Sequence, residues 1–386
     1  MRHKEAFSLI VKPVGSRCNL HCRYCYYLDK GQYSAHAQQT VMEDALLEKL
    51  ISGAIAANPG PVVSFTWHGG EPTLAGLDFY RKVVALQRKY LPAGWQAWNN
   101  LQTNGILLNA AWCRFLAEYG FDVGLSIDGC EAVHDANRLD VGGNPTYQKV
   151  KRAAARLMAS GIRPDLLCTV TAQAAEDPLG VYHALADMGT GWIQFIPVVV
   201  YREDGTLTEE SITPRAYGEF LITVFDEWVR RDLGKLDVQL FAECARIFAG
   251  GQASVCTMAE TCGRVLVAEE DGAIYACDHF VDPEHRLGNL WNGDLERMVN
   301  GAFQRQFGQS KKENLTAECR SCPHLKVCAG GCPKDRSAVS PKGEAGQYLL
   351  CEGLKAFFDH AKPILLQMME FSRKGMKPEE IRKKFS

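Results

Sequence analysis

Three closely spaced cysteines near the start of the chain constrain its fold and chemistry most strongly. Cys18, Cys22 and Cys25 lie in the run SRCNLHCRYCYY, just after an apolar segment. This spacing lets three thiolates converge on one point, but the run provides no fourth ligand. An iron–sulfur cluster normally takes four cysteine ligands. A cluster held by three keeps one iron open, and an open coordination position is where a metal acts on a bound molecule.

A zinc knuckle is the alternative interpretation of the same cysteines. A structural zinc site is closed by four protein ligands, normally with a fourth Cys or His at its own spacing. His21 is adjacent to Cys22 inside the motif and is poorly placed to be that ligand. The spacing therefore favours an iron–sulfur cluster over zinc.

The composition is that of an ordinary globular protein. The chain has 386 residues, 46% hydrophobic and 23% charged, which is enough for a large core and more than one domain. A formal net charge of −2 and the absence of a long apolar run favour neither nucleic acid nor a membrane as partner. The N-terminus has no secretory signal, so we expect a cytoplasmic protein. Its 15 cysteines are then more typical of metal ligands than of disulfides.

Apolar runs alternate with segments of helical period up to about residue 230. The runs with strand character are 7–12, 62–67, 97–102, 123–127, 165–170 and 192–198. The segments between them with helical spacing are 42–57, 77–90, 110–119, 147–160 and 179–188. This alternation predicts an α/β fold of repeated βα units, and six strands fit an incomplete, open (β/α)6 TIM-like barrel.

Short polar motifs follow the first four predicted strands. The three-cysteine loop follows the first, HGGEP the second, QTNG the third and SIDG the fourth. Chemistry in such folds gathers at the C-terminal ends of the strands, so we expect all four motifs on one rim. In HGGEP, Gly69 and Gly70 allow a sharp turn without Cβ atoms, although Gly-Gly and Glu-Pro are also common turn formers.

A second group of cysteines lies in the C-terminal third. Its eight members match the number needed by two four-ligand clusters, and they are Cys256, Cys262, Cys277, Cys319, Cys322, Cys328, Cys332 and Cys351. The run VLVAEEDGAIYACD predicts a hairpin around Asp271-Gly272, with Cys277 on the return strand. The remaining cysteines have no partner spacing and are expected to be buried thiols: Cys113, Cys130, Cys168 and Cys244.

The change in composition also predicts domain boundaries. We expect the partial barrel over residues 1–235 and the cysteine-rich domain over residues 236–371. The second domain should end in a helix over 352–371. The basic residues 372–386 are expected to form a solvated tail.

CxxxCxxC after an apolar strand resembles the signature of the radical S-adenosylmethionine (radical SAM) enzymes. In that family the open iron binds the amino and carboxylate groups of SAM, which is cleaved to a 5′-deoxyadenosyl radical. The resemblance implies that Gly69, Gly70 and Glu71 bind the amino end of SAM. It also implies that Ser126 and Asp128 of SIDG hold the ribose or carboxylate, although SIDG could equally be an ordinary Asp-Gly turn.

The pattern of the later cysteines resembles the SPASM domain, which carries two auxiliary [4Fe–4S] clusters in radical SAM enzymes acting on peptides and proteins. The resemblance implies that the ligands of the first auxiliary cluster are Cys256, Cys262, Cys277 and Cys332. It implies that the ligands of the second are Cys319, Cys322, Cys328 and Cys351. A zinc ribbon in CRSCPHLKVCAGGC is the alternative, but it would leave Cys351 and the upstream cysteines without a role.

Asp278 directly follows Cys277, so its carboxylate is held at the edge of a predicted cluster and is well placed as a general base. An ordinary turn carboxylate is the alternative. The block YACDHFVDPEHRLGN resembles the anaerobic sulfatase-maturating enzymes, in which the equivalent Asp is the catalytic base. The runs FTWHGGEPTLAGLDFYRKV, LQTNGILLN, VGLSIDG, WIQFIP and CAGGCPK extend this resemblance over nearly the whole chain.

This resemblance implies the oxygen-independent oxidation of Cys or Ser to formylglycine in a CxPxR or SxPxR segment of an unfolded or nascent sulfatase. It implies SAM and three [4Fe–4S] clusters as cofactors. A flavodoxin or ferredoxin is the expected electron donor, and the enzyme is expected to be a monomer. Tyr27, His68 and Gln194 match positions at the substrate, although Tyr27 and Gln194 could equally be packing residues.

His68 departs from the family pattern, because the sulfatase maturases usually carry Gln before Gly-Gly. His in this position also occurs in SPASM enzymes that form thioether or carbon–carbon crosslinks in ribosomal peptides, which is the alternative function. Those enzymes often have an added N-terminal precursor-binding domain, which is not expected ahead of Cys18. An electron-transfer iron–sulfur protein would explain the eight later cysteines but not the three-cysteine loop.

Overall fold

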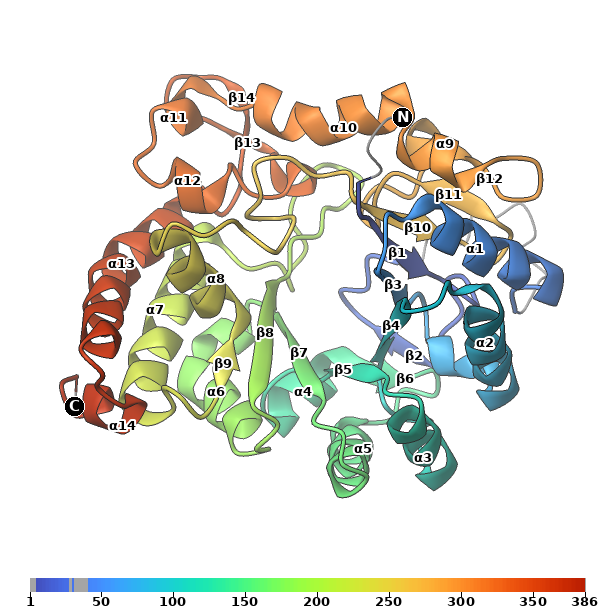
Figure 1. Ribbon diagram of the computed structural model, residues 1–386. Coiled ribbons are helices and arrows are strands. Elements are labelled where there is room, and N and C mark those ends of the chain that lie inside the picture. Colours follow the sequence, from blue (N-terminus) through green and yellow to red (C-terminus); the bar gives the residue numbers. More distant parts are fainter. Residues whose placement is uncertain (1–4, 28–29, 31–40, 386) are drawn as a thin grey trace. The chain divides into compact units, whose positions relative to one another are not determined.

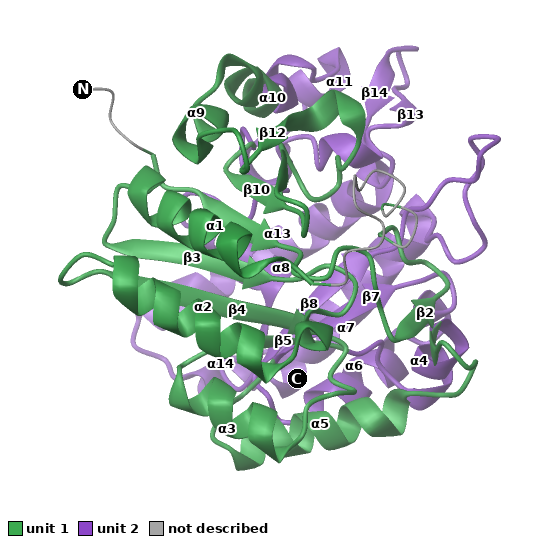
Figure 2. Cartoon of the chain, turned by 90° about the vertical axis from the view of Figure 1, so that its right-hand side faces the viewer, with its two compact units in different colours: residues 1–126, 138–164, 263–309 green, residues 127–137, 165–262, 310–386 purple. Residues whose placement is uncertain are grey.

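The strands predicted from the sequence are all present in the computed structural model, which describes residues 5–27, 30 and 41–385 (Figure 1). The chain divides into two units, each built from three separate segments (Figure 2). Unit 1 comprises residues 1–126, 138–164 and 263–309. Unit 2 comprises residues 127–137, 165–262 and 310–386.

Unit 1 contains strands in the order β12-β11-β10-β1-β3-β4-β5. Their bounds are β1 Ser8–Val11, β3 Val62–Trp67, β4 Gln96–Thr103, β5 Asp122–Ser126, β10 Val265–Ala268, β11 Ala273–Tyr275 and β12 Arg286–Asn289. The run from β10 to β5 is parallel, while β10, β11 and β12 pair antiparallel. A separate antiparallel pair joins β2 Leu20–Cys22 to β6 Arg138–Asp140. The helices are α1 Asp44–Ala57, α2 Leu77–Tyr90, α3 Ala110–Glu118, α5 Tyr147–Ala159, α9 Leu295–Val299 and α10 Ala302–Glu313, whose end lies in unit 2.

Hydrophobic periodicity explains why these elements form. In β3 every second residue, Val63, Phe65 and Trp67, is completely buried, as alternation across a strand requires. In α1 the residues at positions i, i+3, i+4 and i+7 form the buried face: Leu47, Leu50, Ile51 and Ala54. Both sets belong to the same hydrophobic core, so the N-terminal strands provide a rigid support for the loops at their C-terminal ends.

β10 was not predicted as part of the parallel sheet, yet it pairs with β1 in register Val11↔Ala268. Its hairpin with β11 forms around Asp271-Gly272 as predicted, and Gly272 adopts a left-handed φ of 86°. The prediction for Cys277 was wrong in detail, because β11 ends at Tyr275 and Cys277 lies two residues beyond it. The parallel register brings the segment after Ala268 next to the end of β1.

Unit 2 contains the parallel strands β7 Asp165–Val170, β8 Trp192–Pro197 and β9 Asp237–Val238, and the short hairpin of β13 Ala338–Val339 with β14 Ala345–Gln347. Its helices are α4 Glu131–Asn137, α6 Pro178–Ala186, α7 Pro214–Arg231, α8 Gln239–Phe248, α11 Ala317–Arg320, α12 Leu325–Cys328, α13 Cys351–Arg373 and α14 Pro378–Arg382. The predicted helix over 352–371 is α13. It approaches α7 closely, since a Cβ on Gly353 would lie 1.9 Å from the Pro214 carbonyl oxygen.

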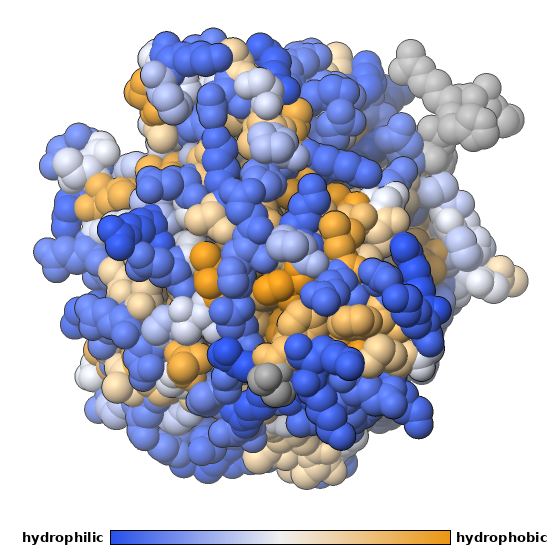
Figure 3. All heavy atoms as spheres, turned by 90° about the vertical axis from the view of Figure 1, so that its left-hand side faces the viewer, coloured by the Kyte–Doolittle hydropathy of each residue, from blue (hydrophilic) through white to orange (hydrophobic). Residues whose placement is uncertain are grey.

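The prediction of a solvated basic tail over residues 372–386 was wrong. The tail forms α14, in which Ile381 is buried, and the Arg382 guanidinium donates a hydrogen bond to the Leu233 carbonyl. On the face drawn in Figure 3, hydrophobic side chains are interspersed with hydrophilic ones. Among the helices of the described chain, none is long and apolar enough to span a membrane.

Candidate active site and cluster sites

The three-cysteine loop runs from the end of β1 through β2. Cys22 is the last residue of β2, which is fixed by its pairing with β6, and the Cys25 amide donates to the Cys22 carbonyl at 3.1 Å. The Cys18 sulfur accepts hydrogen bonds from the Leu20 amide at 3.3 Å and from Asn104 Nδ2 at 3.8 Å. N–H groups directed at a sulfur are what an anionic iron–sulfur cluster requires of its surroundings.

The three thiols are close enough to affect one another electrostatically. Burial raises the pKa of the Cys18 thiol to about 12, and the nearby charges of Glu71, Cys22 and Cys25 act in the same direction, against the hydrogen bond from Leu20. A bound cation or cluster would relieve this mutual repulsion. The loop therefore fits the predicted three-ligand cluster, and its cysteines remain the candidate ligands.

Gly69 and Gly70 dock the end of β3 onto the cysteine loop. The Gly70 amide donates to the Gly15 carbonyl at 2.8 Å. A Cβ on Gly70 would lie 2.0 Å from the Arg17 carbonyl oxygen, and one on Gly69 would lie 2.8 Å from that of Gly15. The two glycines are thus required for close backbone approach, whether or not they also contact SAM as the sequence predicts.

Glu71 is buried and its carboxylate is already engaged by the protein. Oε1 accepts hydrogen bonds from the Thr73 amide at 3.0 Å and the Thr103 hydroxyl at 2.7 Å, and Oε2 accepts from the Asn104 amide at 2.8 Å. Burial raises the pKa of Glu71, while these hydrogen bonds oppose the rise. The carboxylate therefore ties the end of β3 to the end of β4, and its predicted contact with SAM remains a prediction.

Asp278 lies in a network that the sequence did not reveal, because its partner is Lys12 at the end of β1. Asp278 Oδ1 lies 2.5 Å from Lys12 Nζ, with the lysine side chain fully buried and the aspartate side chain 14% exposed. The Tyr26 hydroxyl donates a hydrogen bond to Asp278 Oδ2. Burial alone would raise the pKa of Asp278, but the charge of Lys12, with a further contribution from His279, holds it well below its usual range. Asp278 is consequently ionised at neutral pH.

His68 belongs to the same network. Its Nδ1 lies 3.1 Å from Lys12 Nζ and accepts a hydrogen bond from the Gly69 amide at 2.7 Å. Because both neighbours are donors, Nδ1 carries no proton. Burial and the positive charge of Lys12 lower the pKa of His68 to about 3, which keeps the ring neutral.

Tyr27, the predicted substrate contact, is 3% exposed and packs with Val267 and Tyr275. Its hydroxyl donates a hydrogen bond to Glu269, and Lys12 Nζ lies 4.0 Å from the centre of its ring. Burial raises the pKa of Glu269 to about 8, against the opposing charge of Lys12. The neighbouring Tyr26, which was not predicted from the sequence, is the tyrosine that contacts Asp278.

The remaining predicted contacts are distributed over both units. Ser126 is half-buried at the end of β5 in unit 1. Asp128, in unit 2, is completely buried, and its Oδ1 accepts hydrogen bonds from the Thr169 amide at 3.0 Å and hydroxyl at 2.6 Å. Gln194 is half-buried in β8. Their roles toward SAM or substrate remain predictions.

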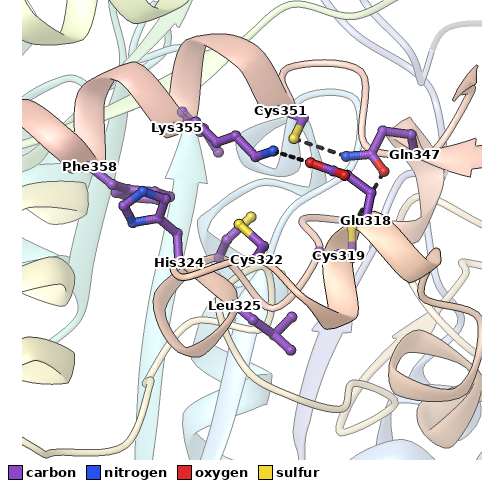
Figure 4. A pocket seen from close by; sticks show the side chains of 12 residues that line it. Glu318, Cys319, Cys322, His324, Leu325, Gln347, Cys351, Lys355 and Phe358 are labelled. Carbon is purple, nitrogen blue, oxygen red and sulfur yellow. Dashed lines mark hydrogen bonds and ion pairs between the residues drawn. The ribbon is translucent and has the colours of Figure 1, made fainter. Parts of the chain in front are cut away.

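The predicted ligands of the second auxiliary cluster surround one cavity in unit 2 (Figure 4). All four line it: Cys319, Cys322, Cys328 and Cys351. Gln347 connects two of them, since its Nε2 donates to the Cys351 sulfur at 2.9 Å and its Oε1 lies 3.6 Å from the Cys319 sulfur. The Thr316 hydroxyl caps α11 by accepting from the Cys319 amide at 3.2 Å. Four thiols around one cavity with a directed amide fit an iron–sulfur cluster.

The ligands predicted for the first auxiliary cluster are shared between the units. Cys256, Cys262 and Cys332 belong to unit 2, and Cys277 belongs to unit 1. Burial raises the pKa of Cys332 to about 11, with the charge of Cys256 adding to the rise, so these two thiols are within electrostatic reach of each other. Of the four cysteines without partner spacing, three are buried as expected, while Cys130 is half-buried.

Within the described residues, no group of three or more His, Cys, Asp or Glu side chains is arranged to hold a single metal ion.

Two family models match the chain. The Radical SAM superfamily matches residues 13–173, and the iron–sulfur cluster-binding domain SPASM matches residues 246–323. These matches and the cysteine sites define the class: an α/β radical SAM enzyme with a SPASM domain, whose cofactors are SAM and several [4Fe–4S] clusters.

Individual relatives narrow this class. The chain is 39% identical to a serine-type anaerobic sulfatase-maturating enzyme of Bacteroides thetaiotaomicron, over 95% of this chain and 91% of the relative. It is 33% identical to a cysteine-type enzyme of Clostridium perfringens, over 94% and 98%. A solved structure, native anSMEcpe with bound AdoMet and Cp18Cys peptide, matches with a TM-score of 0.85 and 33% identity, covering 94% of this chain and 98% of that one. The chain therefore belongs to the anaerobic sulfatase-maturating enzymes.

Proposed function

We propose that this protein oxidises a Cys or Ser side chain in a CxPxR or SxPxR segment of a sulfatase to Cα-formylglycine without using oxygen. Its full-length similarity to both serine-type and cysteine-type maturases supports the reaction but leaves both target residues open. The single observation that carries the proposal is the Asp278 carboxylate, which is held by Lys12 and Tyr26 one residue from a candidate cluster ligand.

The cofactors and the protein have separate tasks. Cys18, Cys22 and Cys25 would hold the cluster that, with SAM, would supply the radical for hydrogen abstraction from the target Cβ, and the eight later cysteines would hold the clusters that would accept the second electron. Asp278 accepts the proton of the target thiol or hydroxyl. Lys12 keeps the carboxylate ionised and, together with Tyr26, fixes its orientation. Where the target is Cys, water hydrolyses the resulting thioaldehyde to the aldehyde and releases hydrogen sulfide.

The surroundings of Asp278 suit this role. Lys12 is fully buried, so its charge acts on the carboxylate with little screening by solvent. His68 is neutral, and with Nδ1 occupied by two donors, its Nε2–H is the ring group left to donate to a peptide. This donor could replace the amide that the family usually supplies from Gln.

The test is to incubate reduced enzyme and SAM anaerobically with matched CxPxR and SxPxR peptides and to determine the product masses. An aldehyde-specific reagent should label the product of at least one peptide, and the relative yields identify the target residue. A peptide that loses hydrogen without gaining a carbonyl would support the crosslinking alternative instead. The same reactions with a flavodoxin or a ferredoxin as reductant test the expected electron donor, and sedimentation tests the expected monomer.

A further inference from the structure

Two cationic side chains in unit 2, Lys311 and Arg336, connect the loops that carry the candidate ligands of the two auxiliary clusters. Lys311 extends from α10 and is completely buried. Its Nζ donates to the carbonyls of Cys256 at 2.6 Å and Thr257 at 3.0 Å, and to that of Ala259. A lysine ammonium has three N–H donors, so three carbonyl acceptors match its charged form.

Arg336 makes the second half of this connection. Its Nη1 donates to the Lys311 carbonyl at 2.7 Å, its Nε to the Gly330 carbonyl at 2.9 Å and its Nη2 to the Ala329 carbonyl at 3.2 Å. Ala329 and Gly330 both have left-handed φ, at 48° and 72°. This turn lies between Cys328 and Cys332, which the ligand assignment gives to different clusters.

The charges of both side chains act on the candidate ligands. Burial lowers the pKa of Lys311, while the charges of Cys262, Cys256 and Cys332 act to raise it. Burial also lowers the pKa of Arg336, against the charges of four thiols: Cys319, Cys332, Cys328 and Cys262. The guanidinium is therefore within electrostatic reach of ligands assigned to both clusters.

We propose that Lys311 and Arg336 form a cation bridge that positions the two auxiliary-cluster loops and raises the reduction potentials of their clusters. The inference rests on the ligand assignment within the proposed function. Electrons added to a cluster make it more negative, so a fixed positive charge nearby favours the reduced form. Lys311 principally positions the 256–262 loop, and Arg336 acts on both clusters.

The test uses the full-length holoenzyme, reconstituted anaerobically, with iron analysis and a redox titration followed by EPR. R336Q should lower the reduction potentials of the auxiliary clusters by about 59 mV. For a one-electron couple this is about a tenfold change in the ratio of oxidised to reduced cluster at a given potential. R336K keeps the positive charge, so its potentials should stay close to those of the wild-type protein. K326M removes an exposed charge beside Cys328 and should leave the potentials unchanged, since solvent screens it. K311M should lose the iron of one cluster.

Four results would overturn the proposal or its basis. Fully loaded R336Q with wild-type potentials would overturn the electrostatic role, and so would equal shifts in R336Q and R336K. Full iron content with unchanged potentials in K311M would overturn the positioning role. If K311M does not fold, the comparison of R336Q with R336K still decides whether the charge matters. Wild-type protein with iron for only one of the three expected clusters would instead refute the assignment of the auxiliary-cluster ligands. Iron analysis distinguishes this result from the other three.

Discussion

Replacing Lys12 with Met tests how much the buried ion pair with Asp278 contributes to stability and activity. The variant keeps an unbranched side chain of similar length but removes the cation that lies 2.5 Å from Asp278. Removing one partner of a buried pair typically costs about 3–5 kcal/mol, because the remaining charge is left buried without compensation. That is a large fraction of the roughly 5–15 kcal/mol that stabilises a typical protein domain. We therefore expect K12M to be clearly destabilised and to lose most formylglycine formation.

The pH dependence of this loss distinguishes the ion pair from simple packing. Burial and Lys12 together lower the pKa of His68 to about 3. Without Lys12, His68 should protonate at higher pH, and its imidazolium can then compensate Asp278. The destabilisation should consequently be largest above the ordinary His pKa of about 6.5 and smaller below it.

The assay is denaturant unfolding of anaerobically reconstituted protein on both sides of that pH. K82M is the matched control, because Lys82 pairs with Asp44 at the surface, where the two side chains are 51% and 67% exposed. A surface pair of this kind contributes only about 0–1 kcal/mol. Equal losses of stability in K12M and K82M, or a K12M loss that does not vary with pH, would show that the Lys12–Asp278 pair is not a stabilising buried ion pair.

Three further predictions follow from the same site. D278N should still form 5′-deoxyadenosine in the presence of peptide, while the yield of formylglycine should fall on the order of a hundredfold. Wild-type yields of both products in D278N would show that Asp278 is an ordinary turn carboxylate and not the base. Replacing Cys18, Cys22 and Cys25 with Ala should abolish SAM cleavage and lower the iron content from about twelve to about eight atoms per chain. Zinc in place of the missing iron would contradict the assignment of two auxiliary iron–sulfur clusters. Because the pKa of His68 is lowered to about 3 in the folded state, unfolding takes up a proton between that pH and about 6.5. Wild-type stability should therefore fall as pH decreases through this window, and H68Q should show a shallower slope.

The strands of the N-terminal half were predicted well from the sequence, because each one is recognisable from the apolar residues within its own short segment. β3 and β7 were predicted at their observed bounds, and β5 was displaced by one residue. Each is a short apolar run bounded by Gly, Pro or polar residues, so the nearest neighbours along the chain carry the information. The candidate cluster ligands were also named from the sequence, the first three by their local spacing and the later eight by resemblance to the SPASM pattern, and their assignment stays a prediction. The boundaries of the predicted domains remain predictions.

The network around Asp278 could not be predicted, because it depends on a pairing between distant segments. Val11 and Ala268 are partners in a parallel register that no local pattern specifies. Lys12 resembled the ordinary polar end of an apolar strand, and only its position directly before the cysteine loop marked it as unusual. Choosing between Tyr26 and Tyr27 required knowing which way each ring points, and motif spacing does not determine that.

Lys12 also explains why Asp278, and not Glu269, is the better candidate for the base. Both carboxylates are close to the same buried cation, and Lys12 supplies only one positive charge. That charge, with a further contribution from His279, holds the pKa of Asp278 below its usual range, whereas burial raises the pKa of Glu269 to about 8 despite Lys12. At neutral pH Asp278 is thus the ionised acceptor and Glu269 is largely protonated. When two carboxyl groups have pKa values pushed apart in this way, their roles in proton transfer are separated as well.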